Sequence, residues 1–173
     1  MSKMSKFQLF SAAAALAAVA AFASVAQAKV FSIPAEDAVA TVNVPDDWQP
    51  SETDGGVELN SPDSGIYIDV EAVKADDVGG AVEETVKLLA GQGLVIDVST
   101  KKASDGEANG LKMHDFSYTG KDKDGPTNFA ITLVETDVSD KFLMVTFWGS
   151  DAAIKTHKPT IDALINSVQL TKH

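Results

Sequence analysis

The residues best suited to nucleophilic chemistry lie in two short serine motifs. Ser99 and Lys102 have the S-x-x-K spacing with which penicillin-binding enzymes pair a serine with a lysine. In those enzymes the motif opens a helix and further motifs accompany it, whereas here it stands alone at the end of an expected strand. Gly149-Ser150-Asp151 lacks the flanking pattern of a G-x-S-x-G nucleophile elbow. We therefore expect no catalytic residues. A hydrolase is the third functional hypothesis, after the protein-binding and small-molecule-binding functions given below. It requires serine, histidine and aspartate to converge from distant segments.

Metal-binding patterns are equally weak. The segment 122–125, Asp-Lys-Asp-Gly, resembles the opening of a calcium loop, but the third acidic ligand and the distal glutamate are missing. A hairpin tip is the favoured interpretation, and weak calcium binding stays open. The histidines His114, His157 and His173 have no close mutual spacing, so a zinc site would need distant segments. We expect His157 to border a helix with one hydrogen bond and His114 to pack on a strand. No metal or cofactor is predicted.

Aromatic side chains form the other candidate site, a groove for sugar or peptide. Its candidate members are Trp48, Tyr67, Phe116, Tyr118 and Trp148. Only Tyr67 occupies a clearly solvent-facing position, and both tryptophans are more simply explained as core or core-edge residues. The paired acids Asp46-Asp47 and Asp76-Asp77 are interpreted as turn and helix-cap residues. The sequence thus predicts no specific binding residue.

Composition excludes several classes of chemistry. The 173 residues contain no cysteine, which rules out thiol catalysis, thiolate metal sites and disulfides. All 14 basic residues are lysine, and 25 acidic residues give a formal net charge of −11. Such a surface repels nucleic acid and anionic lipid. Without arginine, the chain also lacks the planar group that best binds phosphates and carboxylates.

The first 28 residues have the pattern of an export signal. Lys3 and Lys6 precede an uncharged run over 7–25, which ends in Ala26-Gln27-Ala28, a small-x-small cleavage pattern. Cleavage after Ala28 predicts a single α+β domain over residues 29–173 and a periplasmic or secreted location. The alternative is a retained anchor, because the run approaches the roughly 20 residues of a membrane-spanning helix. Its alanine-rich composition favours cleavage.

Hydrophobic periodicity predicts the elements that must position any site. Alternation of apolar and polar residues is clearest from Ile66 to Ala72, and the segment 142–148 is apolar on both faces, as in a central strand. Residues 29–37 are expected to be a short lead before the first strand. The expected strands are 40–44, 57–60, 66–72, 94–101, 111–119, 127–135, 142–148 and 168–171. Leu94, Ile96 and Val98 are expected to point inward from the strand 94–101, and residues 105–110 are expected to form a turn.

Two segments have helical periodicity. The first follows Asp76-Asp77, carries apolar residues at helical spacing from Val78 to Leu89, and ends at Gly91 and Gly93. The second spans about 151–166, and Asp151 is expected to cap it. Pro159 predicts either a kink or a restart of this helix. These elements predict an α+β fold: a single antiparallel β-sheet with two main helices packed on it, an α/β sandwich.

Three segments resemble the Mog1/PsbP-like superfamily. They are Val42-Asn43-Val44-Pro45-Asp46-Asp47-Trp48, then Leu59-Asn60-Ser61-Pro62-Asp63 with the strand from Ile66 to Val70, and finally Ile161-Asp162-Ala163-Leu164-Ile165-Asn166-Ser167-Val168. The resemblance covers most of the region after the signal and implies a sandwich whose members mostly bind or help to assemble other proteins. It carries over no site residue.

These observations predict a non-enzymatic accessory or protein-binding domain. Its expected partner is another exported or envelope protein, engaged through an exposed sheet face or a loop edge. We expect no nucleic-acid partner and no stable membrane insertion after cleavage. The alternative is a small-molecule binder with an apolar pocket between the sheet and the helices.

Overall fold

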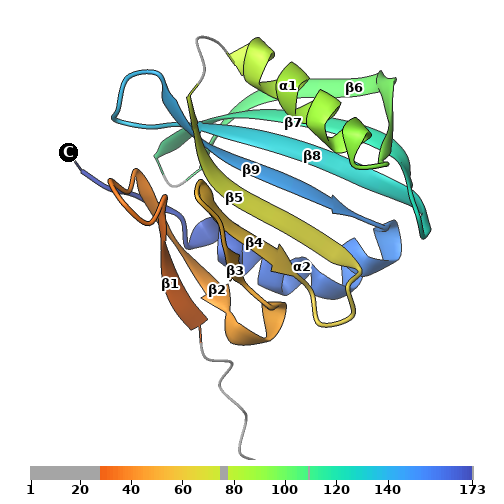
Figure 1. Ribbon diagram of the computed structural model, residues 1–173, viewed down its shortest axis with the longest axis horizontal. Helices are drawn as coiled ribbons and strands as arrows, with labels where there is room; N and C mark the ends of the chain where they lie inside the picture. Colours follow the sequence, from red (N-terminus) through yellow and green to blue (C-terminus); the bar gives the residue numbers. More distant parts are fainter. Residues whose placement is uncertain (1–27, 75–77, 109, 173) are drawn as a thin grey trace, which may run out of the picture.

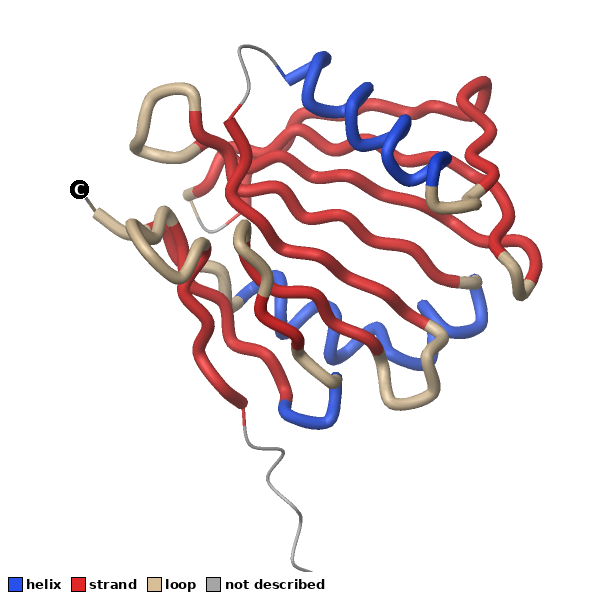
Figure 2. Tube along the Cα trace, in the orientation of Figure 1, coloured by secondary structure: helices blue, strands red, loops and turns tan. Residues whose placement is uncertain are grey.

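The computed structural model describes residues 28–74, 78–108 and 110–172. Residues 1–27 of the expected signal sequence, the proposed helix cap Asp76-Asp77 and His173 lie outside the described residues. The described chain forms two antiparallel sheets and two α-helices, shown in Figures 1 and 2. The α+β class is therefore confirmed, but the prediction of a single sheet is wrong.

The larger sheet has seven strands in the order β3-β4-β5-β9-β8-β7-β6. Its strands are β3 (Ser51–Glu52), β4 (Gly56–Asn60), β5 (Ile66–Lys74), β6 (Val95–Ala108), β7 (Leu111–Asp122), β8 (Gly125–Glu135) and β9 (Lys141–Gly149). As expected from its two apolar faces, β9 lies in the middle, between β5 and β8. The predicted tip between β7 and β8 shrinks to a two-residue turn, because both strands are longer than the sequence indicated.

A second sheet of three strands has the order β1-β2-β10. It contains β1 (Ala28–Ile33), β2 (Ala40–Pro45) and β10 (Gln169–Leu170). The single-sheet prediction failed because the segment that forms β1 was interpreted as a short lead before the first strand. Strand β1 pairs along the whole of one edge of β2, and β10 pairs with Ala40 and Thr41 on the other edge, so β2 belongs to this sheet and not to the larger one. The expected final strand does form, but it joins this second sheet.

The two faces of the larger sheet are covered by different elements (Figure 1). Helix α1 (Val78–Gly91) packs on one face, where Ala81 and Val82 meet strand residues such as Phe129 and Ile131. Helix α2 (Asp151–Asn166) and the three-stranded sheet cover the other face. We call the face under α1 the α1 face. Along β5, alternation places Tyr67, Asp69 and Glu71 on the α1 face and the buried Ile66, Ile68 and Val70 on the other.

Both predicted helices form at the expected positions. Helix α1 ends at Gly91, and Gly93 follows with φ of 92°, a conformation that glycine adopts without strain. Helix α2 is capped by the Ser150 hydroxyl, which accepts a hydrogen bond from the Ala153 amide, and continues through Pro159. Asp151, expected to cap the helix, is instead its first residue.

Strand β6 departs most from expectation. It was predicted to end near Lys101 and to be followed by a turn, but it continues to Ala108. Its pairing with β7 shifts register between Asp97 and Lys102, which indicates a β-bulge. An irregularity of this kind breaks the alternation of side chains between faces, and Val98, predicted to point inward, is 64% exposed. The Ser99–Lys102 motif lies at this irregularity, within a strand and not at its end.

Candidate functional site

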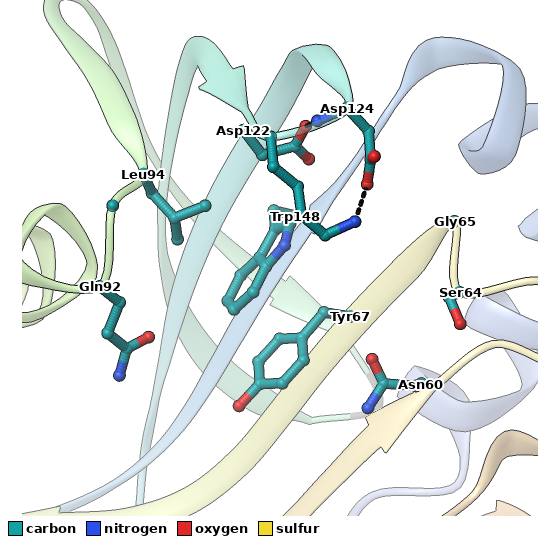
Figure 3. A pocket seen from close by; sticks show the side chains of 11 residues that line it. Asn60, Ser64, Gly65, Tyr67, Gln92, Leu94, Asp122, Asp124 and Trp148 are labelled. Atoms are coloured by element: carbon teal, nitrogen blue, oxygen red, sulfur yellow. Dashed lines mark hydrogen bonds and ion pairs between the residues drawn. The ribbon is translucent and has the colours of Figure 1, made fainter.

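The most distinctive surface feature is a cleft at the edge of the sheet where β5 begins and β9 ends, shown in Figure 3. Tyr67 and Trp148 are register partners on these strands, and their rings stack with centroids 3.8 Å apart and an interplanar angle of 19°. Both rings remain partly exposed. The cleft around them has a volume of about 340 Å³ and is open to solvent. Tyr67 faces outward, as predicted, and Trp148 packs against the edge of the core, which is also as predicted.

Polar groups from three loops surround the stacked rings. Asn60 and Ser64 come from the β4–β5 hairpin, Gln92 follows α1, and Asp122 and Asp124 come from the β7–β8 hairpin. The last two belong to the segment that resembled a calcium loop. The Asp122 carboxylate accepts hydrogen bonds from the backbone amides of residues 124 and 125, which is the hairpin-tip structure favoured from the sequence.

Three carboxyl groups extend the polar surface along the sheet from Tyr67. Asp69 and Glu71 follow on β5, and Glu58 is the register partner of Asp69 on β4; we call these three residues the acidic row. Burial, then the charges of Glu71 and Glu58, raise the pKa of Asp69 to about 7. Burial also raises the pKa of Glu71. The acidic row is therefore held near other acids and partly away from water. From the sequence, acidic pairs were considered only at turn and helix-cap positions, so the acidic row was not predicted.

The pKa of Tyr67 is raised by burial and by the negative charges of the acidic row. Hydrogen bonding to Glu58 is a further cause of this raised pKa. The phenol consequently remains a neutral hydrogen-bond donor at physiological pH. The cleft and the acidic row form one continuous surface through the Tyr67 side chain.

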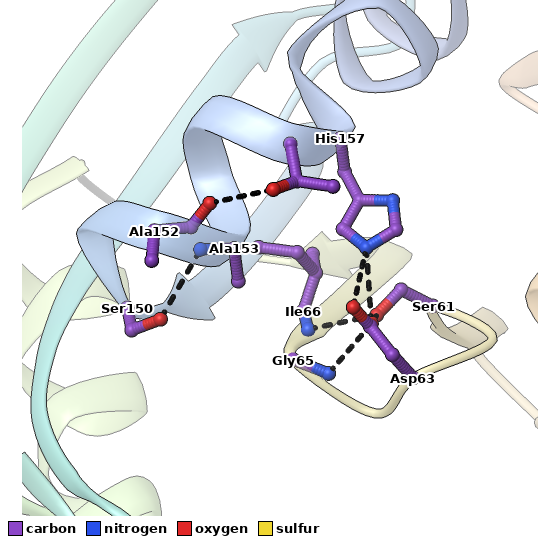
Figure 4. Close-up of polar contacts among 9 residues, drawn as sticks. Ser61, Asp63, Gly65, Ile66, Ser150, Ala152, Ala153 and His157 are labelled. Carbon is purple, nitrogen blue, oxygen red and sulfur yellow. Dashed lines mark hydrogen bonds and ion pairs between the residues drawn. The ribbon is translucent and has the colours of Figure 1, made fainter.

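A serine, an aspartate and a histidine do meet elsewhere, as Figure 4 shows. The Ser61 hydroxyl donates to Asp63 Oδ1 at 2.6 Å, and both Asp63 carboxylate oxygens lie 3.0 Å from His157 Nε2. However, the carboxylate stands between the other two groups. Ser61 is fully buried, and its oxygen also accepts the Ile66 amide. In this order, and with Ser61 buried, His157 cannot activate Ser61 as a nucleophile.

The contact instead fastens the β4–β5 hairpin to α2. Hydrogen bonds from Ser61, His157 and the Gly65 amide lower the pKa of Asp63. His157 thus has the single polar partner expected from the sequence, and its ring also meets that of Trp48 edge to face at 5.5 Å. Trp48 is 2% exposed, which confirms it as a core residue.

His114 lies away from the cleft, on the same face of β7 as Phe116 and Tyr118. Its Nδ1 is 2.7 Å from Asp105 and its Nε2 is 3.3 Å from Glu135, and hydrogen bonding to Asp105 is the main cause of its raised pKa. The sequence predicted the shared face but missed both acidic partners, because they come from other strands. Of the five aromatic candidates, the structure therefore brings only Tyr67 and Trp148 to one cleft.

Apolar clefts lie on the opposite face of the sheet, beside α2. One of about 290 Å³ is lined by residues such as Ala130, Phe147 and Ile161. A second, of about 180 Å³, shares Thr132 and Ile165 with the first. This is the kind of pocket that the small-molecule alternative requires.

No family model and no curated protein sequence matches the chain. Solved structures do match. Cyanobacterial PsbP (CyanoP) of Synechocystis covers 87% of this chain and 96% of its own, with TM-score 0.57 and 14% identity. The Ran-binding protein Mog1p of Saccharomyces cerevisiae covers 83% and 95%, with TM-score 0.51 and 11% identity. LpqN, involved in cell envelope biogenesis of Mycobacterium tuberculosis, covers 84% and 92%, with TM-score 0.53 and 12% identity.

The chain has the Mog1/PsbP-like fold. The superfamily resemblance found in the sequence is thereby confirmed at the level of fold. At these identities the match carries over no function. Among the described residues, no helix is long and apolar enough to cross a membrane.

Proposed function

We propose that this protein is an exported, non-enzymatic accessory protein that binds another envelope protein through the cleft formed around Tyr67 and Trp148. The observation that carries the proposal is the partly exposed aromatic stack, ringed by polar side chains from three separate loops. Aromatic pairs with apolar faces and polar edges are favoured at protein interfaces, because they bury large area at little cost in side-chain entropy.

Two further observations support this function. The Ser61–Asp63–His157 contact, which brings catalytic residue types together, is arranged as a structural clamp. In addition, the fold is shared with a Ran-binding protein and with a protein involved in cell envelope biogenesis. The periplasmic location rests on the sequence pattern of residues 1–28.

Site-specific photocrosslinking in intact cells tests the proposal. A photoreactive amino acid at Gln92, an exposed residue that lines the cleft, is expected to capture one reproducible envelope protein. The matched control places the same group at Lys155, an exposed residue of α2 on the opposite side of the larger sheet. Capture of the same proteins at both positions, or of no protein at Gln92, would contradict the proposal.

The apolar clefts beside α2 favour a second candidate function, the binding of a small apolar molecule. Native mass spectrometry of the purified protein would then show a retained mass that the cleft-filling substitution Ala130→Phe removes. A wild-type protein without any retained mass, after incubation with a lipid extract, would exclude this function.

A further inference from the structure

The part of the α1 face next to the cleft carries negative charge without a compensating lysine. Strands β4, β5 and β9 contain only two lysines, Lys74 and Lys141. These two are register partners, and strand alternation places them on the opposite face from Asp69. Among the described residues, none of the ion pairs involves a member of the acidic row. The acidic row is therefore complementary to a positive group from outside the chain.

The aromatic stack adjoins these carboxyl groups. Tyr67 is two residues before Asp69 on the same face of β5, and Asp69 and Glu58 both raise the pKa of its hydroxyl. An ammonium or guanidinium group is attracted to the face of a tyrosine or tryptophan ring, and the attraction grows when water is partly excluded. A cation beside Tyr67 would therefore meet aromatic and carboxylate groups together.

A buried polar atom lies beside the acidic row. Thr146 on β9 is the register partner of Asp69 and projects from the same face. It is 3% exposed, and its Oγ1 has no hydrogen-bond partner in the described part of the chain. A buried hydroxyl without a partner is costly, and a donor group bound next to Asp69 would supply one.

We propose that the acidic row, together with the Tyr67–Trp148 stack, binds a lysine or arginine side chain on an extended segment of the partner protein. This inference rests on the proposed function and specifies the chemistry of the partner. Charge complementarity selects a basic segment, because the whole chain has a formal charge of −11 and the face of β4, β5 and β9 that carries the acidic row has no lysine, while Lys123 at the cleft is already paired with Asp124. The rings and the cleft would accommodate the aliphatic part of the side chain and the flanking residues.

Binding of a tetralysine peptide with blocked termini tests the inference, measured by calorimetry at low ionic strength. Glu71→Gln removes one charge of the acidic row and keeps the size of the side chain. We expect it to weaken binding about tenfold. The control Glu36→Gln removes the same charge from an exposed residue in the loop between β1 and β2 and is expected to change the affinity by less than about twofold. Tyr67→Ala is expected to weaken binding as well.

A second peptide separates specific from diffuse attraction. Tetra-acetyllysine has nearly the same length but no side-chain charge, and we expect it not to bind. Equal losses in Glu71→Gln and Glu36→Gln, or equal binding of the acetylated peptide, would overturn the inference. If those results came with specific crosslinking at Gln92, the proposed function would stand and only the basic partner would be wrong. Failure of the Gln92 crosslink would instead overturn the proposed function itself.

Discussion

Replacing Asp69 with asparagine is expected to raise the free energy of unfolding at pH 8. Asp69 lies in the acidic row, where burial and the charges of Glu71 and Glu58 oppose its ionisation. Asparagine has nearly the same shape and still offers an oxygen acceptor, but it carries no charge. The substitution therefore removes an unfavourable interaction from the folded state without opening a cavity.

The pKa of Asp69 sets the size and the pH range of this effect. It rises from 3.8 to about 7 on folding, and one pKa unit corresponds to about 1.4 kcal/mol. The full shift would give about 4 kcal/mol as an upper bound. The charges of Asp69 and Glu71 affect one another, and water screens part of their repulsion. We therefore expect Asp69→Asn to raise the free energy of unfolding at pH 8 by about 1–2 kcal/mol.

The direction follows from proton binding in the two states. Below pH 3.8, Asp69 is protonated in both the folded and the unfolded chain, so its ionisation contributes nothing. Between about pH 4 and pH 7 the folded state holds a proton that the unfolded state has lost. The contribution of Asp69 to stability therefore decreases as pH rises through this range. Asp69→Asn removes this dependence, so its advantage is absent near pH 4 and complete near pH 8.

Urea unfolding followed by circular dichroism, at pH 4.5 and pH 8, measures this difference. The matched control is Asp137→Asn, an exposed position in the turn between β8 and β9. Comparison with the wild type at each pH cancels the contributions of the other titrating groups. A stabilisation of equal size at both pH values, or a less stable Asp69→Asn protein at pH 8, would refute the reasoning.

Three other predictions concern the cleft and the core. Tetralysine binding is expected to tighten from pH 6 to pH 8 in calorimetric titrations, because ionisation of the acidic row strengthens attraction to the peptide. Ser61→Ala leaves the buried Ile66 amide without its acceptor and is expected to lower the free energy of unfolding by about 1–3 kcal/mol, measured in urea. Gly56→Ala is expected to lower the melting temperature strongly, because a Cβ would lie 1.9 Å from the Val70 carbonyl oxygen. Gly91→Ala is expected to raise the melting temperature, because a Cβ there has free space and alanine favours the helix more than glycine does.

The same measurements provide the controls. Ser32→Ala removes an exposed hydroxyl from β1, and we expect it to change the free energy of unfolding by less than about 0.5 kcal/mol. Equal losses in Ser32→Ala and Ser61→Ala would show that the hairpin hydrogen bond contributes nothing. If the affinity for tetralysine did not vary with pH, the acidic row would not contribute to peptide binding. A Gly56→Ala protein as stable as the wild type would contradict the close approach of β4 and β5.

Local periodicity was enough to predict much of the fold. The alternation along Ile66–Ala72 assigns each residue to a face, and the structure confirms the assignment: Ile68 is 2% exposed, whereas Tyr67 reaches the cleft. Helix α1 was equally predictable, because its apolar spacing and the following glycines are local signals. Where a bulge breaks the local period, as before Lys102, the prediction of buried and exposed faces failed.

The candidate site could be predicted only in part. Tyr67 was recognised as solvent-facing from its own strand, but its stacking on Trp148 depends on the register of β5 against β9. The acidic row has the same origin, since Glu58 and Asp69 are brought together by strand pairing. Neither contact leaves a short motif in the sequence.

The sequence by itself determined both helices, most of the strands and the faces of a regularly alternating strand such as 66–72. It also determined the chemistry that the chain lacks, since it contains no cysteine or arginine. Only the tertiary structure decided that β2 joins β1 and β10 in a separate sheet. It also decided that Ser61, Asp63 and His157 form a clamp, and that Tyr67 and Trp148 share a cleft. The physical reason is that secondary structure follows from interactions within a few residues, whereas strand partners and register depend on which distant segments bury their apolar faces together.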